Sequence, residues 1–233
     1  GVMSCNPAIG GLGKGHLVRE VDALGGLMGI AADISGIQFR LLNKSKGPAV
    51  QGPRTQSDRG LYKNAVQNIL ASNGNIKIIE GEATDLYIKR GVVNGVELED
   101  GTKISGGSVV LTTGTFLNGL IRIGEEKVNA GRVGDFSSTR LAKRIKDMGL
   151  NIGRLKTGTP ARLSSKTINW DILETQEADK QPTLFSFLHK KPFQRQITCG
   201  ITYTNRITHN IIRDNIEKSA VFNGSITSNG PRY

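Results

Sequence analysis

The stretch ATDLYIKRGVVNGVELEDGTKISGGSVVLTTGT, residues 83–115, contains the clearest secondary-structure pattern of the chain. Three short alternating runs with a possible turn at Asn94-Gly95 predict a small antiparallel meander at about residues 83–105. The continuous apolar run Val109–Thr115 then ends in a Thr/Gly turn, which is typical of a buried parallel strand. Because ligands of open α/β sheets bind at the carboxyl ends of such strands, this turn is a candidate binding site.

On both sides of that stretch, apolar spacing predicts helices alternating with strands. The expected helices cover about residues 17–32, begin at a cap on Ser57, cover 138–148, and run from Thr208 to about Lys218; the expected strands cover 37–41, 76–79 and 197–204. The polar stretch 164–196 is expected to be an insertion with short elements. With 30 glycines in 233 residues and only 5% aromatic residues, the composition favours an α/β protein with many tight turns.

The net charge of +11 favours a polyanionic partner, nucleic acid above all. No apolar run is long enough for a membrane span, and no signal peptide opens the chain, so the cytoplasm is the expected location. The two cysteines, Cys5 and Cys199, lie far apart, and the three histidines share no metal-ligand spacing. The sequence therefore predicts neither a disulfide framework nor a metal site.

The loop SCNPAIGGLGKG, residues 4–15, places a thiol, Cys5, just before four glycines and Lys14. Glycines bring backbone N–H groups close to a ligand, and a nearby cation favours the thiolate. The spacing matches neither a Walker loop nor G-x-G-x-x-G. From spacing alone two interpretations stay open: an anion-binding loop beside a reactive thiol, or a glycine-rich turn beside a structural cysteine.

A second basic segment, NKSKGPAV at residues 43–50, is followed by Arg54. Lys44 and Lys46 lie in a Gly/Pro loop, where backbone amides add donors, so we expect these three side chains and Lys14 to contact RNA or another anion. No Ser/His/Asp arrangement supports a hydrolase. The C-x-x-x-x-C pair of a disulfide reductase is also missing, which argues against a generic FAD/NAD oxidoreductase.

Read together, these motifs resemble the MnmG/GidA flavoproteins over essentially the whole chain. The matching segments are residues 4–16, EVDALGG at 20–26, 43–50, 56–59, GTFL at 114–117, LKTGTP at 155–160, 202–205 and the closing GPRY. The resemblance implies a flavoenzyme that modifies the wobble uridine of certain tRNAs at C5. It also implies FAD, NADH and a methylene-folate donor, a partner GTPase called MnmE, and a homodimer at full length.

The resemblance also implies roles for single residues. Cys5 matches a thiol tied to catalysis, whereas Cys199 has no such counterpart and is expected to be structural. The positions that fall where the family contacts FAD are Ala83, Thr112, Gly114, Thr115 and Ser138. The positions linked to NAD binding are Gly230, Pro231, Arg232 and Tyr233.

The implied fold is an FAD-binding Rossmann-like core of the two-dinucleotide-binding-domain type, with the meander and an inserted α/β domain. Residues 1–150 are expected to form a partial FAD-binding domain, and residues 151–233 an inserted domain that is incomplete at its C-terminal end. The family's N-terminal phosphate-binding glycine motif is expected before Gly1. We therefore expect the chain alone to be impaired as an enzyme, and a non-catalytic RNA-binding remnant is the alternative.

Overall fold

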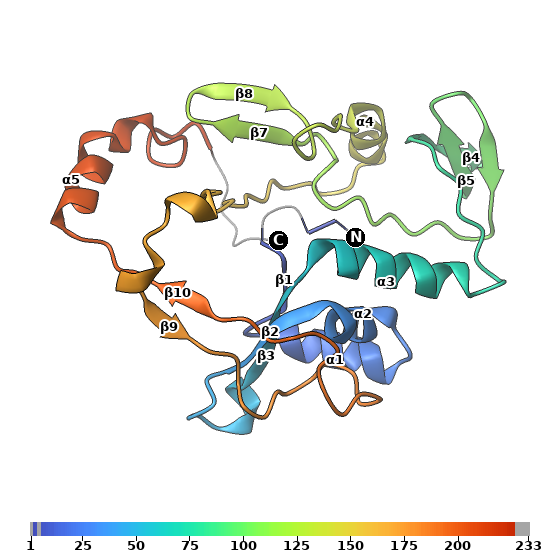
Figure 1. The fold of residues 1–233 in the computed structure, drawn as a ribbon. Helices are drawn as coiled ribbons and strands as arrows, with labels where there is room; N and C mark the ends of the chain where they lie inside the picture. The colour runs from blue at the N-terminus through green and yellow to red at the C-terminus, as the bar shows by residue number, and fades with distance from the viewer. Residues whose placement is uncertain (1, 4–5, 227–233) are drawn as a thin grey trace. The chain divides into compact units, whose positions relative to one another are not determined.

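The computed structural model of this chain describes residues 2–3 and 6–226 and divides into two compact units (Figure 1). The first unit combines Gly1–Lys77 with Gly158–Tyr203, and the second combines Ile78–Thr157 with Thr204–Tyr233. Each unit therefore joins segments that are far apart in the sequence. These compact units are not the predicted domains 1–150 and 151–233, and that domain division stays a prediction.

The first unit contains a three-stranded antiparallel sheet with the order β1-β3-β2. Its strands are β1 (Ala8–Gly10), β2 (Gly36–Leu42) and β3 (Gly52–Ser57). The sequence predicted β2 but placed the start of β3 in a basic loop, because Gly52 and Pro53 are typical of loops. Pro53 is tolerated here because it lies near the strand end.

Three helices pack around this sheet: α1 (Lys14–Ala23), α2 (Leu27–Ser35) and α3 (Arg59–Ala71). The single helix predicted over 17–32 is two helices, because Gly25 adopts a positive φ of 83° and ends the first one. The cap of α3 is Asp58, whose carboxylate accepts a hydrogen bond from the Leu61 amide at 2.9 Å. Ser57, the predicted cap, is instead the last residue of β3.

The core of the first unit lies between the sheet and these helices. It consists of Ile9, Val18, Ala31, Ala32, Phe39, Tyr62, Ala65, Leu184 and Phe185. The last two come from the polar stretch expected to be an insertion, so that stretch contributes to the core. Its short elements are the 3₁₀ turns Ser165–Thr167 and Trp170–Ile172 and the strand β9 (Glu174–Gln176), which pairs with β10 (Cys199–Ile201).

Cys199 is half-buried, and its thiol lies 3.1 Å from the side-chain oxygen of Gln38. The amide nitrogen of Gln38, in turn, donates to the carbonyl of Gln176 at 3.0 Å. A thiol that joins β10 to β2 in this way has a structural part in the fold.

The second unit holds the predicted meander, which is confirmed as β4 (Ala83–Lys89), β5 (Val92–Leu98) and β6 (Lys103–Ser105). The turn between β4 and β5 is at Arg90-Gly91, where both φ angles are positive, and not at Asn94-Gly95. Gly95 lies inside β5. A Cβ there would lie 2.0 Å from the Ile104 carbonyl oxygen, so the close approach of β6 requires glycine.

The other elements described in the second unit are a hairpin, two helices and the 3₁₀ turn Ile216–Lys218. The hairpin is β7 (Leu120–Ile123) with β8 (Glu126–Asn129), and the helices are α4 (Thr139–Asp147) and α5 (Arg206–Asp214). Both helices match the predicted ones within a few residues, whereas the hairpin was not predicted. Among the described residues no helix has both the length and the apolar character needed to cross a membrane.

Two predicted strands, Val109–Thr115 and 76–79, are wrong: neither segment forms a strand. A buried parallel strand needs hydrogen-bonding neighbours, and within the described ranges the ladders between named strands are all antiparallel and pair other segments. The side chain of Val110 is accordingly 83% exposed. The apolar run alone did not show whether a pairing partner was present.

Candidate functional site

The glycine loop between β1 and α1 lies tightly against β3. Gly10 and Gly11 have positive φ angles of 83° and 101°, and the Gly11 amide donates to the Pro53 carbonyl at 2.9 Å. A Cβ on Gly10 would lie 2.3 Å from that same carbonyl oxygen and 2.6 Å from Cζ of Phe185. Glycine is therefore required for this close approach.

The basic loop, residues 43–50, is held by its own polar groups. The side-chain amide of Asn43 donates to the Val50 carbonyl at 3.1 Å, and that of Gln51 donates to the carbonyls of Lys44 and Lys46 at 3.2 and 3.0 Å. Both lysines are exposed, and neither forms an ion pair with a described residue. The loop thus presents two free cations on an ordered backbone.

The glycine loop and the basic loop line one open depression. Its walls are Leu12, Gly13, His16, Asn43, Ala49 and Val50. The Nε2 atom of His16 is buried and has no hydrogen-bond partner within residues 2–3 and 6–226. Arg54 pairs with Gly10 in the β-ladder, and the first residue of α1 is Lys14.

The four predicted anion-binding residues therefore belong to one unit, around two loops that the sequence treated separately. Cys5 lies outside the described residues, as do Gly230, Pro231, Arg232 and Tyr233. Their predicted roles stay predictions.

The predicted flavin-contacting residues all lie in the second unit. The Thr115 hydroxyl donates to the Gly131 carbonyl at 2.7 Å, and the Ser138 amide donates to the Phe116 carbonyl at 2.9 Å. The turn that follows Gly114 is thus joined to the N-terminus of α4, where Ser138 is the cap residue. Thr112 is exposed in a segment without regular secondary structure, and Ala83 begins β4.

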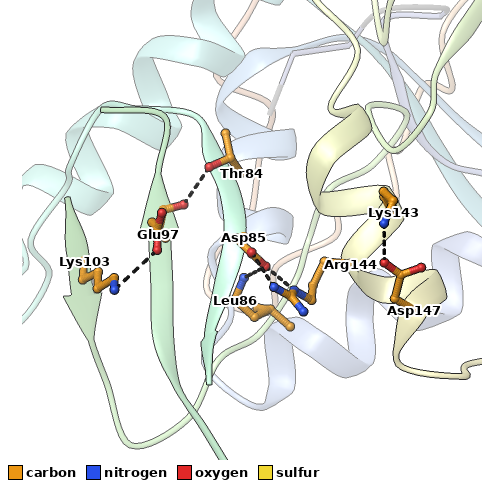
Figure 2. Close-up of polar contacts among 8 residues, drawn as sticks. All are labelled: Thr84, Asp85, Leu86, Glu97, Lys103, Lys143, Arg144 and Asp147. Atoms are coloured by element: carbon orange, nitrogen blue, oxygen red, sulfur yellow. Dashed lines mark hydrogen bonds and ion pairs between the residues drawn. The ribbon is translucent and has the colours of Figure 1, made fainter. Parts of the chain in front are cut away.

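A bidentate ion pair ties α4 to β4 (Figure 2). Asp85 accepts from Nε of Arg144 and, at 2.7 Å, from its Nη2, while the Leu86 amide donates to the same carboxylate at 2.7 Å. The hydrogen bond from Arg144 holds the pKa of Asp85 below its ordinary value of 3.8. Because Ala83 begins β4 and Ser138 caps α4, this pair joins the two elements that carry predicted flavin contacts.

Sequence reasoning missed this pair. It placed Arg144 in a basic set with Lys143 and Lys146 that could be a solvated face. Lys143, which pairs with Asp147, and Lys146 are exposed, whereas Arg144 pairs with Asp85 (Figure 2). One signal in the sequence could have indicated it: Asp85 lies within the predicted meander strand, and a carboxylate in a half-buried strand needs a partner.

In the part of the chain that the structure describes, no group of three or more histidine, cysteine, aspartate or glutamate side chains is arranged to hold a metal ion.

Comparison with known proteins identifies a family over the whole chain. The sequence profile of the family described as GIDA, glucose inhibited division protein A, matches residues 1–233. Two curated relatives are both described as tRNA uridine 5-carboxymethylaminomethyl modification enzyme MnmG. The one from Granulibacter bethesdensis is 53% identical and the one from Pelobacter propionicus 49%, each over 100% of this chain. The chain spans 38% and 37% of the length of these two relatives.

Two crystal forms of Aquifex aeolicus GidA are similar in structure, at 43% identity. Form I superimposes with a TM-score of 0.89 over 100% of this chain and 40% of its own, and form II with 0.86 over 94% and 38%. The predicted α/β fold with an antiparallel meander is confirmed by this similarity and by the strands described above.

Proposed function

The chain belongs to the glucose inhibited division protein A family, and from that membership we propose that it is part of a flavin-dependent enzyme that modifies the wobble uridine of tRNA at C5. One observation carries the proposal: the two curated tRNA uridine modification enzymes match the chain from end to end at about half identity. The exposed lysines of the basic loop add to it, because RNA binding depends on cations that contact phosphates.

The residues of the second unit suit a phosphate-bearing cofactor such as FAD. Ser138 caps α4 without using its hydroxyl in a cap hydrogen bond, and no acidic residue stands in the first turn of that helix. Gly114 has a φ of 58°, and the space around its Cβ position is open. Bare backbone and a hydroxyl at a helix N-terminus are the donors that a phosphate accepts.

We propose that Ala83, Thr112, Gly114, Thr115 and Ser138 hold FAD. The flavin, when bound, supplies hydride transfer between NADH and a one-carbon unit from methylene-folate. The chain's own part is to orient the cofactor, and the Asp85–Arg144 pair keeps β4 and α4 together for that purpose.

Cys5 is proposed to act on the uridine itself. C5 of uridine is a weak nucleophile until a thiolate adds to C6, and the electron pair of the C5–C6 double bond then becomes available at C5. Lys14 and the glycine amides favour the thiolate form needed for that addition. Further proposals are NAD binding by Gly230, Pro231, Arg232 and Tyr233, cooperation with the GTPase MnmE, homodimer formation at full length, and a cytoplasmic location.

The test compares two cysteine substitutions in cells whose only copy of the protein carries the change. Cys5→Ser is expected to abolish the modified wobble nucleoside in hydrolysed tRNA, measured by mass spectrometry. Cys199→Ser is the matched control, since that thiol only joins β10 to β2, and the nucleoside should persist. An unchanged nucleoside level with Cys5→Ser would remove this thiol from catalysis.

A second candidate is an RNA-binding chain without flavin chemistry, favoured by the net charge of +11 and the free cations of the basic loop. The purified chain titrated with FAD separates the two. A flavin absorption spectrum that stays with the protein through gel filtration supports the enzyme. RNA binding without retained flavin supports the alternative.

A further inference from the structure

Residues 183–196 pack against, and form hydrogen bonds with, the helices and sheet of the first unit. Phe185 is fully buried in the core against Gly10. Further along, the side-chain amides of Gln194 and Gln196 donate to the carbonyls of Ile34 and Gly36 at 2.9 and 3.1 Å. In Figure 1 this stretch is the orange chain between β9 and β10.

A buried carboxylate shapes the loop inside this stretch. Asp33 on α2 is fully buried and accepts from the backbone amides of Phe185 and Ser186, both at 2.9 Å. It also lies 2.9 Å from Nδ1 of His189. Since a buried carboxylate without partners is strongly unfavourable, these contacts order the loop from 185 to 189.

The surface of this ordered loop carries apolar side chains that face water. In residues 187–195, which we call the aromatic–cationic loop, Phe187 is 66%, Leu188 78% and Phe193 54% exposed. The guanidinium of Arg19 lies 4.3 Å from the centre of the Phe187 ring, and the His189 ring lies edge-on to Phe193 at 4.8 Å. Each ring therefore packs against a neighbouring side chain, and both rings remain exposed to solvent.

Cations alternate with these rings. Lys190, Lys191 and Arg195 are exposed and form no ion pair with a described residue, and the sequence FLHKKPFQR contains no acidic residue. Two carboxylates that contact this stretch, Asp33 and Asp22, already accept from the backbone amides of Phe185, Ser186 and Phe187. The charged side chains that residues 187–195 themselves carry are thus all cationic.

We propose that the aromatic–cationic loop is a contact surface for unpaired nucleotides of RNA, with Phe187 and Phe193 stacking on bases and Lys190, Lys191 and Arg195 contacting phosphates. Proteins that bind single strands combine these two features, because each base has a face for stacking and each nucleotide a charge. An ordered loop also binds without a large loss of conformational entropy. The proposal rests on the proposed function, since it names where that RNA is held.

A protein partner is the competing occupant of an exposed apolar surface. Protein interfaces are depleted of lysine at their centres, whereas here two lysines lie between the rings. Charge and residue type together therefore favour RNA.

The test measures binding of a fluorescein-labelled tRNA anticodon stem–loop to the purified chain by fluorescence anisotropy. Phe193→Ala is expected to raise Kd about tenfold, and Phe193→Trp to restore it, because tryptophan also stacks. The double variant Lys190→Gln/Lys191→Gln should reduce the slope of log K against log salt by about 1.4. Two exposed lysines of the same unit provide the control, Lys63→Gln/Lys180→Gln, which should leave that slope unchanged.

Circular dichroism spectra and Tm values equal to wild type establish that each variant is folded. If wild type binds the stem–loop and the loop variants bind equally well with the same slope, the proposal is overturned while the RNA function stands. If wild type binds no RNA, the proposed function fails with it. Loss of a protein complex with unchanged RNA binding would also overturn the proposal.

Discussion

Gly10 and Phe185 are in contact although most of the chain separates them. The glycine is needed for two reasons: its φ is positive, and the Phe185 ring and the Pro53 carbonyl fill the space where a Cβ would lie. Only the first reason is local. The shape of the predicted catalytic loop therefore depends on a residue of the polar stretch.

Gly10→Ala is expected to lower the free energy of unfolding by about 3–5 kcal/mol, combining backbone strain with overpacking. Gly13→Ala is the matched variant: its φ of 72° brings the same strain, but nothing lies within 4 Å of its Cβ position. We expect that variant to lose only about 1–2 kcal/mol. Guanidinium unfolding followed by the fluorescence of Trp170, the single tryptophan, measures both. Equal losses would contradict the close packing at Gly10.

Asp33→Asn replaces a buried carboxylate by an amide whose NH₂ group faces donors. Asp33 accepts hydrogen bonds from two backbone amides and lies beside His189. We therefore expect the substitution to lower the free energy of unfolding by about 3 kcal/mol. Asp22→Asn, which loses a single bond from the Phe187 amide, should cost about 1 kcal/mol. The same unfolding measurement compares them, and a neutral Asp33→Asn would show that the carboxylate does not order the loop.

At the scale of elements, helices and the meander were predictable because periodic apolar spacing reflects burial of one face. The errors had two causes. The helix over 17–32 is interrupted at Gly25, whose positive φ ends α1, and the expected strand at Val109–Thr115 has no pairing partner in the described residues. Periodicity reports burial, but strand formation requires a second segment at hydrogen-bonding distance.

The ion pair between β4 and α4 predicts a pH dependence. Arg144 lowers the pKa of Asp85, so the pair stabilises the fold fully above the ordinary carboxyl pKa of 3.8, and this contribution is lost as the pH falls through the lowered value. Asp85→Asn should therefore be less stable than wild type near neutral pH, and the difference should vanish in acid. Urea unfolding at several pH values, monitored by circular dichroism, measures it.

Lys143→Ala provides the control for this experiment. It breaks the exposed pair with Asp147 on the same helix, one residue from Arg144. Exposed pairs of this kind contribute little, so stability at neutral pH should be nearly unchanged. If Asp85→Asn behaves like Lys143→Ala, the β4–α4 pair does not stabilise the unit.

At the scale of the whole molecule, the basic loop and the aromatic–cationic loop both belong to the first unit. If Lys44, Lys46, Lys190 and Lys191 each contact one phosphate of a single strand, log K should fall against log salt with a slope of about −2.8. Kd would then rise about fifty-fold from about 50 to about 200 mM salt. Anisotropy titrations over this range measure the slope, and a salt-independent Kd would exclude phosphate contacts by these lysines.

The residue pattern was enough to predict the family, the α/β character and the antiparallel meander. Each of these depends on features that are local in the sequence, namely residue motifs and apolar periodicity. The tertiary structure alone decided which distant groups meet: Asp33 with the loop at 185–189, Asp85 with Arg144, and Gly10 with Phe185. A buried carboxylate or a missing Cβ shows that some partner is needed, but only the folded chain brings a particular one within reach.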